Sequence, residues 1–146
     1  MNATMNKYVG IVIVLLIGST FFLGCDRTED LLVRKDGTWN IISLNERTFR
    51  DSELLTDVDS TDNLGSVIFN ADGSGRNLDA TGGQIGDPFS WTYNDFALTI
   101  TQGGESLVTT VLESTKKAQR WVKITEEDLL GYTYRTEVTT LLELAN

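Results

Sequence analysis

Residues 88–102, PFSWTYNDFALTITQ, alternate large apolar side chains with small polar ones on both sides of a central Asn-Asp pair. Asn and Asp tolerate the positive φ angles of a two-residue hairpin loop, so we place the loop at Asn94-Asp95. Trp91 then faces Leu98 across the hairpin. In this register all the large apolar residues share one face: Phe89, Trp91, Tyr93, Phe96, Leu98 and Ile100. The segment therefore predicts an antiparallel hairpin with one buried face.

Two further hairpins extend this sheet in both directions along the chain. A two-residue loop at Gly103-Gly104 pairs Ile100 with Leu107 and continues the apolar face. Upstream, residues 66–80 allow a two-residue loop at 72–73 or a four-residue loop at 72–75. We predict the longer loop, because it places Phe69 opposite Leu78 and keeps apolar side chains together.

The remaining segments complete an all-β pattern of short runs rich in Thr, Val, Ile and aromatic residues. Residues 118–125 predict a strand, residues 126–130 a helical turn or loop, and residues 132–144 a strand with alternating apolar side chains. The charged segment 26–36 predicts a tether with a short edge strand at 31–33. About eight sequential strands hide their edges by closing, so we predict an antiparallel meander that forms a barrel.

The N-terminal segment has the layout of a secretory signal peptide. Lys7 precedes an uncharged apolar run at 9–24, which is shorter than the roughly 20 residues of a membrane-spanning helix. Cys25, the single cysteine of the chain, follows this run directly, and a disulfide would need a second one. The alternative is a buried structural thiol. The position of Cys25 between a signal segment and a polar stretch favours lipidation.

Phe22-Leu23-Gly24-Cys25 resembles a lipobox, the cleavage and acylation signal of bacterial lipoproteins. The resemblance implies a signal peptide over 1–24, diacylglycerol and N-acyl chains (palmitate) on Cys25, and an acylated tether over 25–36. It places the protein in the cell envelope of a Gram-negative bacterium, held to a membrane by lipid. The acidic residues that follow Cys25 favour the outer membrane or cell surface, and Asp26 leaves inner-membrane retention as the alternative.

Gly37-Thr38-Trp39 resembles the G-x-W motif of lipocalins. The successions at 69–73, 90–91 and 98–100 are similar to the lipocalin-like domain of bacterial envelope lipoproteins. This resemblance covers residues 37–146 and implies one lipocalin-like β-barrel domain, with Gly37 and Trp39 as structural residues at one end. It also implies that Arg135 is a candidate for the arginine that stacks on Trp39.

The charge and residue inventory argues against several functions. With 21 acidic and 12 basic residues the net charge is −9, which repels nucleic acid. The chain has no histidine, so it lacks Ser-His-Asp systems and Cys/His zinc sites. Residues 57–62 miss the EF-hand spacing, and the adjacent acids at 126–128 do not suit a glycosidase pair. We therefore expect no enzyme activity, metal or cofactor.

The sequence predicts a binding protein, with a small apolar ligand as the leading cargo. The predicted ligand-binding residues are Trp91, Tyr93, Phe96, Tyr132 and Tyr134. The alternative is an envelope protein-protein interaction module whose barrel is filled. The predicted inward set is large for eight strands: Phe69, Phe89, Trp91, Tyr93, Phe96, Leu98, Ile100, Val111, Tyr132 and Tyr134. We therefore expect a largely filled interior, with a mouth pocket opposite Trp39 that is smaller than the usual ligand pocket of about 300–1,000 Å³.

Overall fold

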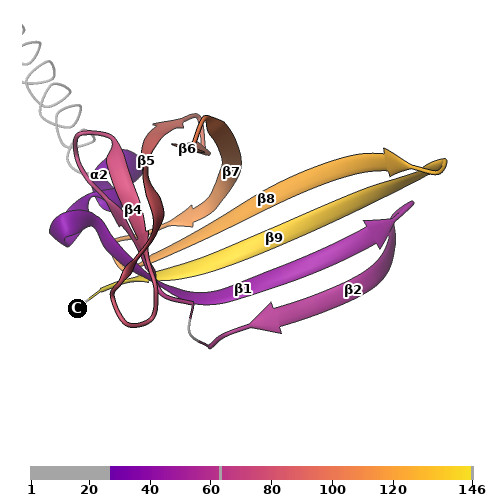
Figure 1. The fold of residues 1–146 in the computed structure, drawn as a ribbon, viewed down its shortest axis with the longest axis horizontal. Helices are drawn as coiled ribbons and strands as arrows, with labels where there is room; N and C mark the ends of the chain where they lie inside the picture. Colours follow the sequence, from indigo (N-terminus) through magenta and orange to yellow (C-terminus); the bar gives the residue numbers. More distant parts are fainter. Residues whose placement is uncertain (1–26, 63, 146) are drawn as a thin grey trace, which may run out of the picture.

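The computed structural model describes residues 27–62 and 64–145 (Figure 1). Two short helical segments come first, α2 (Thr28–Leu32) and the 3-10 helix η1 (Arg34–Gly37). The strands of the described residues follow: β1 (Thr38–Arg50), β2 (Glu53–Ser60), β3 (Ser66–Phe69), β4 (Ser74–Leu78), β5 (Gln84–Asn94), β6 (Ala97–Gln102), β7 (Glu105–Ser114), β8 (Ala118–Leu129) and β9 (Tyr132–Leu144). The predicted all-β class is confirmed.

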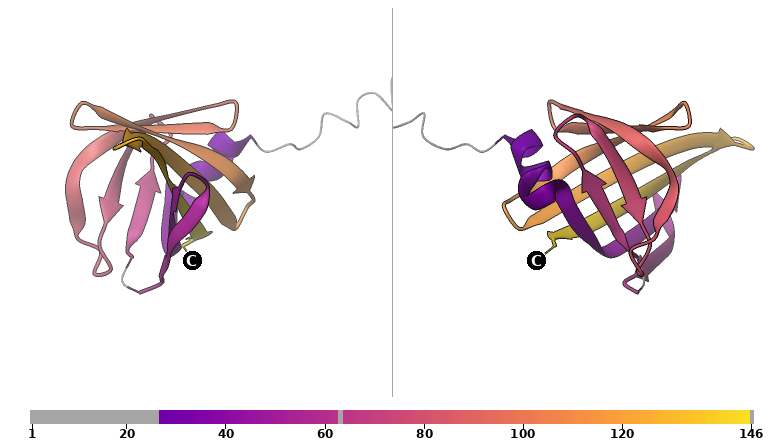
Figure 2. Two further views of the ribbon diagram at one scale, coloured as in Figure 1. Left: turned by 90° about the vertical axis from the view of Figure 1, so that its right-hand side faces the viewer. Right: turned by 60° about the vertical axis from the view of Figure 1, so that its left-hand side comes forward.

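Eight of these strands form a closed antiparallel barrel, as the sequence predicts. Each strand from β3 to β9 pairs with the next, and β1 closes the ring by pairing with β3 on one edge and β9 on the other. The two further views in Figure 2 show the curved wall that β3 to β7 make around the interior. Within the barrel, closure removes the sheet edges that an open meander would expose.

The core lies inside the barrel and is made of large apolar side chains. Trp39, Phe69, Leu98 and Leu142 are at most 1% exposed. The remaining buried members of the cluster are Leu32, Val67, Phe89, Trp91, Val111 and Trp121. Gly75 on β4 makes this packing possible, because a Cβ at that position would lie 2.2 Å from the Phe89 ring.

α2 and η1 cover one end of the barrel, which we call the closed end. Leu32 is fully buried there, and its carbonyl oxygen accepts a hydrogen bond of 2.8 Å from Trp39 Nε1. The predicted edge strand at 31–33 is therefore wrong. A single helical turn can bury two adjacent leucines against the end of the barrel. Their burial therefore does not require pairing with a neighbouring strand. The prediction of an acylated tether over 25–36 includes residues outside the described part.

A four-stranded sheet projects from the barrel, and we call it the finger (residues 44–60 and 123–140). It consists of β2, the second half of β1, the first half of β9 and the second half of β8. Figure 1 shows these strands running far beyond β3 to β7, with the β8–β9 turn at the opposite end of the molecule from α2. β7 stops pairing with β8 at Thr110–Val122, so the outer half of β8 is an edge.

The hairpin registers differ in part from those predicted. The Gly103-Gly104 loop and the pairing of Ile100 with Leu107 are confirmed. In the β5–β6 hairpin, however, Trp91 pairs with Ile100, and the two loop residues are Asp95 and Phe96. This register differs from the predicted one by two residues, so it keeps the same side chains on the buried face and expels only Phe96. The alternation of apolar residues cannot distinguish the two registers.

Two more local predictions are wrong. In the β3–β4 hairpin Phe69 pairs with Gly75, which differs from both registers considered above. Gly75 leaves room for the Phe89 ring, which a Cβ at that position would meet at 2.2 Å. Residues 126–129 are strand, not a helical turn or loop, because the outer half of β8 pairs continuously with β9 up to Leu129 and Tyr132.

Candidate functional site

The barrel interior is filled by aromatic rings rather than by an open cavity. Phe69 lies at the centre of this ring cluster and makes edge contacts with three other rings, at centroid distances of 5.6 Å to Phe89, 5.4 Å to Trp91 and 5.7 Å to Trp121. Trp91 Nε1 donates to the carbonyl oxygens of Asn70 and Ser74 at 3.2 and 3.0 Å. These rings and hydrogen bonds fill the barrel interior next to the closed end.

The open end of the barrel, opposite η1 and Trp39, has a hollow of about 570 Å³. Ile100, Leu107 and Val108 provide apolar surface, while Asn77, Glu105 and Lys123 provide polar groups. The hollow lies where β7 and β8 separate. A mouth pocket was predicted at this end, but its volume falls within the usual ligand range and the prediction of a smaller one is wrong.

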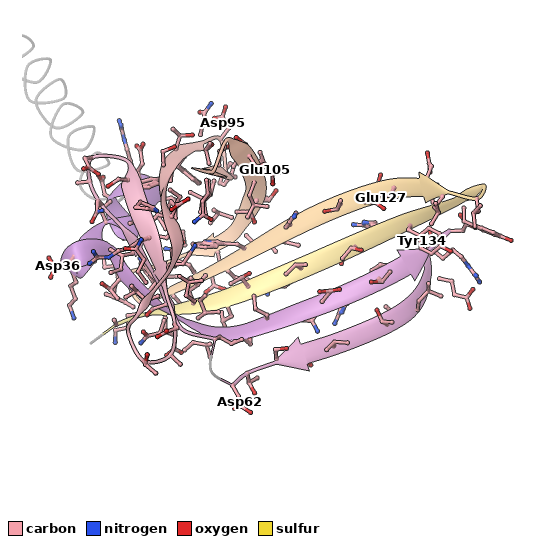
Figure 3. The ribbon with its side chains drawn as sticks, in the orientation of Figure 1. Asp36, Asp62, Asp95, Glu105, Glu127 and Tyr134 are labelled. Carbon is pink, nitrogen blue, oxygen red and sulfur yellow. The ribbon has the colours of Figure 1, made fainter. Side chains whose placement is uncertain are left out.

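The structure does not bring the five predicted ligand-binding residues together. Trp91 is 7% exposed and belongs to the core, against which Tyr93 packs from the side of α2. Phe96 is 70% exposed in the β5–β6 turn, so its predicted inward position is wrong. Tyr132 and Tyr134 lie at the start of β9, on the finger, and Figure 3 shows Tyr134 far from Asp95, the neighbour of Phe96 in the β5–β6 turn. None of the five lines the open-end hollow.

The two residues predicted to be structural both lie at the closed end. Trp39 is fully buried. Gly37 has a φ of +63°, and a Cβ there would lie 1.8 Å from the carbonyl oxygen of Phe69, so no other residue fits without a backbone shift. Arg135 does not stack on Trp39. Its guanidinium lies on the finger, 5.9 Å from the Phe49 ring centroid. Cys25, the predicted lipidation site, lies outside the described residues.

One face of the finger carries an ordered set of polar side chains. Asn45 Nδ2 donates to carboxylate oxygens of Asp57 and Asp59, both at 2.7 Å. Arg47 Nε lies 3.3 Å from Asp57 Oδ2. Nearer the turn, Arg135 lies between Glu126 and Glu137. These contacts hold the long side chains in place on a sheet that has no core behind it.

The tip of the finger is apolar and exposed. Leu130, in the β8–β9 turn, is 89% exposed, and its φ is +55°. Leu129 and Tyr132, which pair with each other beside this turn, are 56% and 47% exposed, and with Leu130 they form what we call the tip patch. Leu54 and Leu55 on β2 are 49% and 44% exposed, and as neighbours in a strand they point to opposite faces of the finger. Arg50 lies with its guanidinium carbon 5.2 Å from the Tyr132 ring centroid and borders the patch. Exposed apolar groups that gather in one place mark interaction sites.

The finger is also strongly acidic. Its two segments, 44–60 and 123–140, contain nine Asp or Glu residues and four Lys or Arg residues. Figure 3 shows Glu127 and Tyr134 on the projecting strands, well away from Asp36 at the closed end. The acidic groups and the apolar tip thus lie on the same projecting part of the molecule.

Two surface turns contain carboxylates with altered acidity. The Thr81 hydroxyl, followed by the backbone N–H groups of Gly83 and Thr81, lowers the pKa of Asp79. The Ser74 hydroxyl and backbone N–H lower the pKa of Asp72. Each carboxylate accepts these bonds within its own turn, so both groups stabilise turns. Among residues 27–62 and 64–145 no cluster of three or more metal-ligating side chains occurs.

Sequence reasoning missed the finger, although the chain contains one signal for it. Residues 53–60 are acidic and entirely exposed, which hid β2 from a search for buried faces. β1 and β9 each have 13 residues, about twice the usual strand length. Such length is the signal that could have predicted strands extending past the barrel. No described helix is long and apolar enough to cross a membrane.

Comparison of the chain with protein-family models, with curated proteins and with solved structures finds no match. The lipocalin-like resemblance therefore stays an expectation, and the candidate sites are supported by their geometry alone.

Proposed function

We propose that this protein is a lipid-anchored envelope protein that uses its finger to bind a partner protein and catalyses no reaction. The observation that carries the proposal is the finger, an acidic four-stranded sheet whose apolar tip lies at the far end of the molecule from α2. A filled barrel supports the same proposal, because it serves as a rigid base rather than as a container.

Three features of the finger suit protein recognition. The tip patch offers apolar area, which supplies most of the free energy of association. The excess of carboxylates steers a basic partner and aligns it on approach. The outer half of β8 is an unpaired edge, to which an extended segment of a partner can add as a further strand.

The test is site-specific photo-crosslinking in cells that express the full protein at its normal level. A photoreactive residue in place of Leu130 should give one discrete adduct, whereas the same residue at exposed Thr92 on the barrel should not. Replacing Glu126, Glu127 and Asp128 with lysines should remove the Leu130 adduct, because the charge complementarity is reversed. Equal adducts at both positions, or none at Leu130, would contradict the proposal.

The anchor is tested separately at Cys25. Replacing Cys25 with Ser removes the sulfur that would receive diacylglycerol, so the variant should keep its signal segment and should carry no acyl chains. Intact mass measurement of the purified protein reads both outcomes. An unacylated wild-type protein would exclude the lipid anchor while leaving the finger proposal standing.

The open-end hollow supports a second candidate function, the binding of one small ligand that has an apolar body and a polar group. The hollow combines Ile100 and Leu107 with Lys123, and its volume of about 570 Å³ suits one such molecule. Native mass spectrometry of the gently extracted protein should then show a stoichiometric bound mass, which the variant Leu107→Arg should lose. Recovery of the wild-type protein without any bound mass would exclude this candidate.

A further inference from the structure

Phe96 is an exposed aromatic residue in a backbone conformation that rarely holds one. It is 70% exposed, and its φ is +68° next to Asp95 at +46°. Two positive φ angles are typical of hairpin turns that contain Gly, Asn or Asp. A bulky residue with positive φ is unusual, and such strain concentrates at functional positions. Burial does not explain Phe96, because its ring points away from the core.

Phe96 lies close to the point where the described chain begins. Arg27 and Thr28 line one surface hollow together with Tyr93 and Phe96. Arg27 is the second residue after Cys25, and two extended residues span at most about 7 Å. A lipid on Cys25 would therefore hold the β5–β6 turn within a short distance of the bilayer surface.

A second exposed apolar side chain lies on β7, the strand that is hydrogen-bonded to the β5–β6 turn. The carbonyl oxygen of Phe96 accepts a hydrogen bond of 2.7 Å from the backbone N–H of Val111. The next residue, Leu112, is 53% exposed and sits at a bulge in β7, where it has no directly paired residue on β8. Phe96 in the β5–β6 turn and Leu112 on β7 are thus two exposed apolar side chains on segments that are hydrogen-bonded to each other.

The distribution of charge favours the same orientation. The segments at the closed end, 27–37, 70–73, 95–96 and 115–117, contain five basic and five acidic residues. The finger has nine acidic and four basic residues. Membrane surfaces with anionic headgroups repel acidic protein surfaces. The neutral closed end is therefore the part of the domain that can approach such a surface at the lowest electrostatic cost.

We propose that Phe96 and Leu112 form a membrane-contact patch that inserts into the headgroup region beside the lipid anchor and orients the domain. The inference rests on the proposed acylation of Cys25. A single aromatic and a single aliphatic residue add little to the affinity that several acyl chains provide. Their role is to fix which side of the barrel faces the bilayer, so that the finger points away from it.

The test uses the full acylated protein in vesicles of phosphatidylethanolamine and phosphatidylglycerol. Acylation consumes the only native cysteine, so Phe96→Cys, Leu112→Cys and Leu130→Cys each offer one thiol for an environment-sensitive fluorophore. At positions 96 and 112 the emission should shift to the blue, and lipids with a nitroxide high on the acyl chain should quench it, because the probe lies in the headgroup and upper acyl region. At position 130 on the finger tip neither change should occur.

Flotation of the same vesicles tests the lipid anchor separately from the membrane-contact patch. A protein that floats but shows no quenching at 96 and 112 would overturn the contact patch while the anchor stands. A protein that does not float would exclude the anchor itself. Quenching at 130 equal to that at 96 would overturn the proposed orientation. A blue shift at 96 that needs added envelope proteins, and does not occur in lipid alone, would overturn the lipid contact in favour of a protein partner.

Discussion

Two buried tryptophans differ in whether the indole N–H makes a hydrogen bond. Trp39 Nε1 donates to the Leu32 carbonyl, and this bond joins α2 to the first strand. Trp121 is also buried, but its Nε1 has no hydrogen-bond partner within the described part of the chain. The first indole therefore contributes a bond as well as apolar area, whereas the second contributes area and carries an unpaired donor.

The variants Trp39→Phe and Trp121→Phe test this difference, since both remove the same ring atoms. Trp39→Phe leaves the buried Leu32 carbonyl unpaired, so it should lower the free energy of unfolding by about 1–3 kcal/mol more than Trp121→Phe does. Urea unfolding of both variants, followed by circular dichroism, provides the measurement. Equal losses would show that the bond contributes nothing net.

Phe96 supplies the second prediction at this scale. Glycine accepts positive φ without a steric cost, so Phe96→Gly should leave the free energy of unfolding unchanged or raise it by up to about 1 kcal/mol. Leu98→Ala, two residues further along, removes a fully buried side chain and should lower it by about 2–5 kcal/mol. Thermal and urea unfolding distinguish the two outcomes. A large loss in Phe96→Gly would mean that the ring packs against the domain.

At the scale of elements, the turns set the registers of the strand pairs. They do so through polar side chains that are not part of the alternating apolar pattern of the strands. The turn before β5 is held by Asp79, whose carboxylate accepts bonds from the Thr81 hydroxyl and from the N–H of Gly83. The turn before β4 uses Asp72 and Ser74 in the same way. Both turns therefore depend on an ionised carboxylate.

Asp79→Asn should make the stability less sensitive to acid. The folded-state pKa of Asp79 lies below the ordinary value of 3.8. Its contribution is therefore complete above pH 3.8 and is lost as the pH falls through the lower folded-state pKa. The Asn variant should lose less stability than wild type over that acidic window, and Glu143→Gln, a change on the exposed end of β9, should not. Urea titrations at several pH values test this, and parallel curves for wild type and Asp79→Asn would contradict it.

The same scale explains how much of the structure can be predicted from the sequence. The Gly103-Gly104 turn is predictable, because two adjacent glycines supply both positive φ angles. The β5–β6 turn is not, because Asn94-Asp95 has better turn chemistry than the Asp95-Phe96 pair that occupies it. The apolar run at 31–33 has a pattern that is compatible with a strand. The local sequence does not show that the end of the barrel buries this segment as a helical turn. The candidate site residues were predicted less accurately than the strands, because the finger is exposed and has no apolar alternation on β2.

At the scale of the whole molecule, the protein has a solid barrel and an extension that contains few buried residues. Leu142 on the barrel part of β9 is 1% exposed, while no residue between Tyr132 and Leu141 is buried. The stability of the two parts should differ accordingly, because local opening costs least where apolar contacts are few.

Hydrogen exchange can measure this within a single strand. Amides of β8 in residues 123–129 pair with β9 alone, whereas those in residues 119–122 lie between β7 and β9. The outer segment should exchange at least about tenfold faster. Exchange resolved by mass spectrometry of overlapping peptides gives the comparison, and binding of a partner to the finger should slow only the outer segment. Uniform protection along β8 would contradict the division into two parts.

β1 belongs to both parts of the molecule, and this has a mechanical consequence. It starts under α2, crosses the barrel wall and ends at the finger tip, joined to β9 by eleven residue pairs. Tension between the closed end and the tip runs parallel to these strands, so it loads their hydrogen bonds in shear, and the bonds must fail together rather than one after another. A pull on the tip is thus carried along β1 to Trp39, whose indole is bonded to Leu32 of α2.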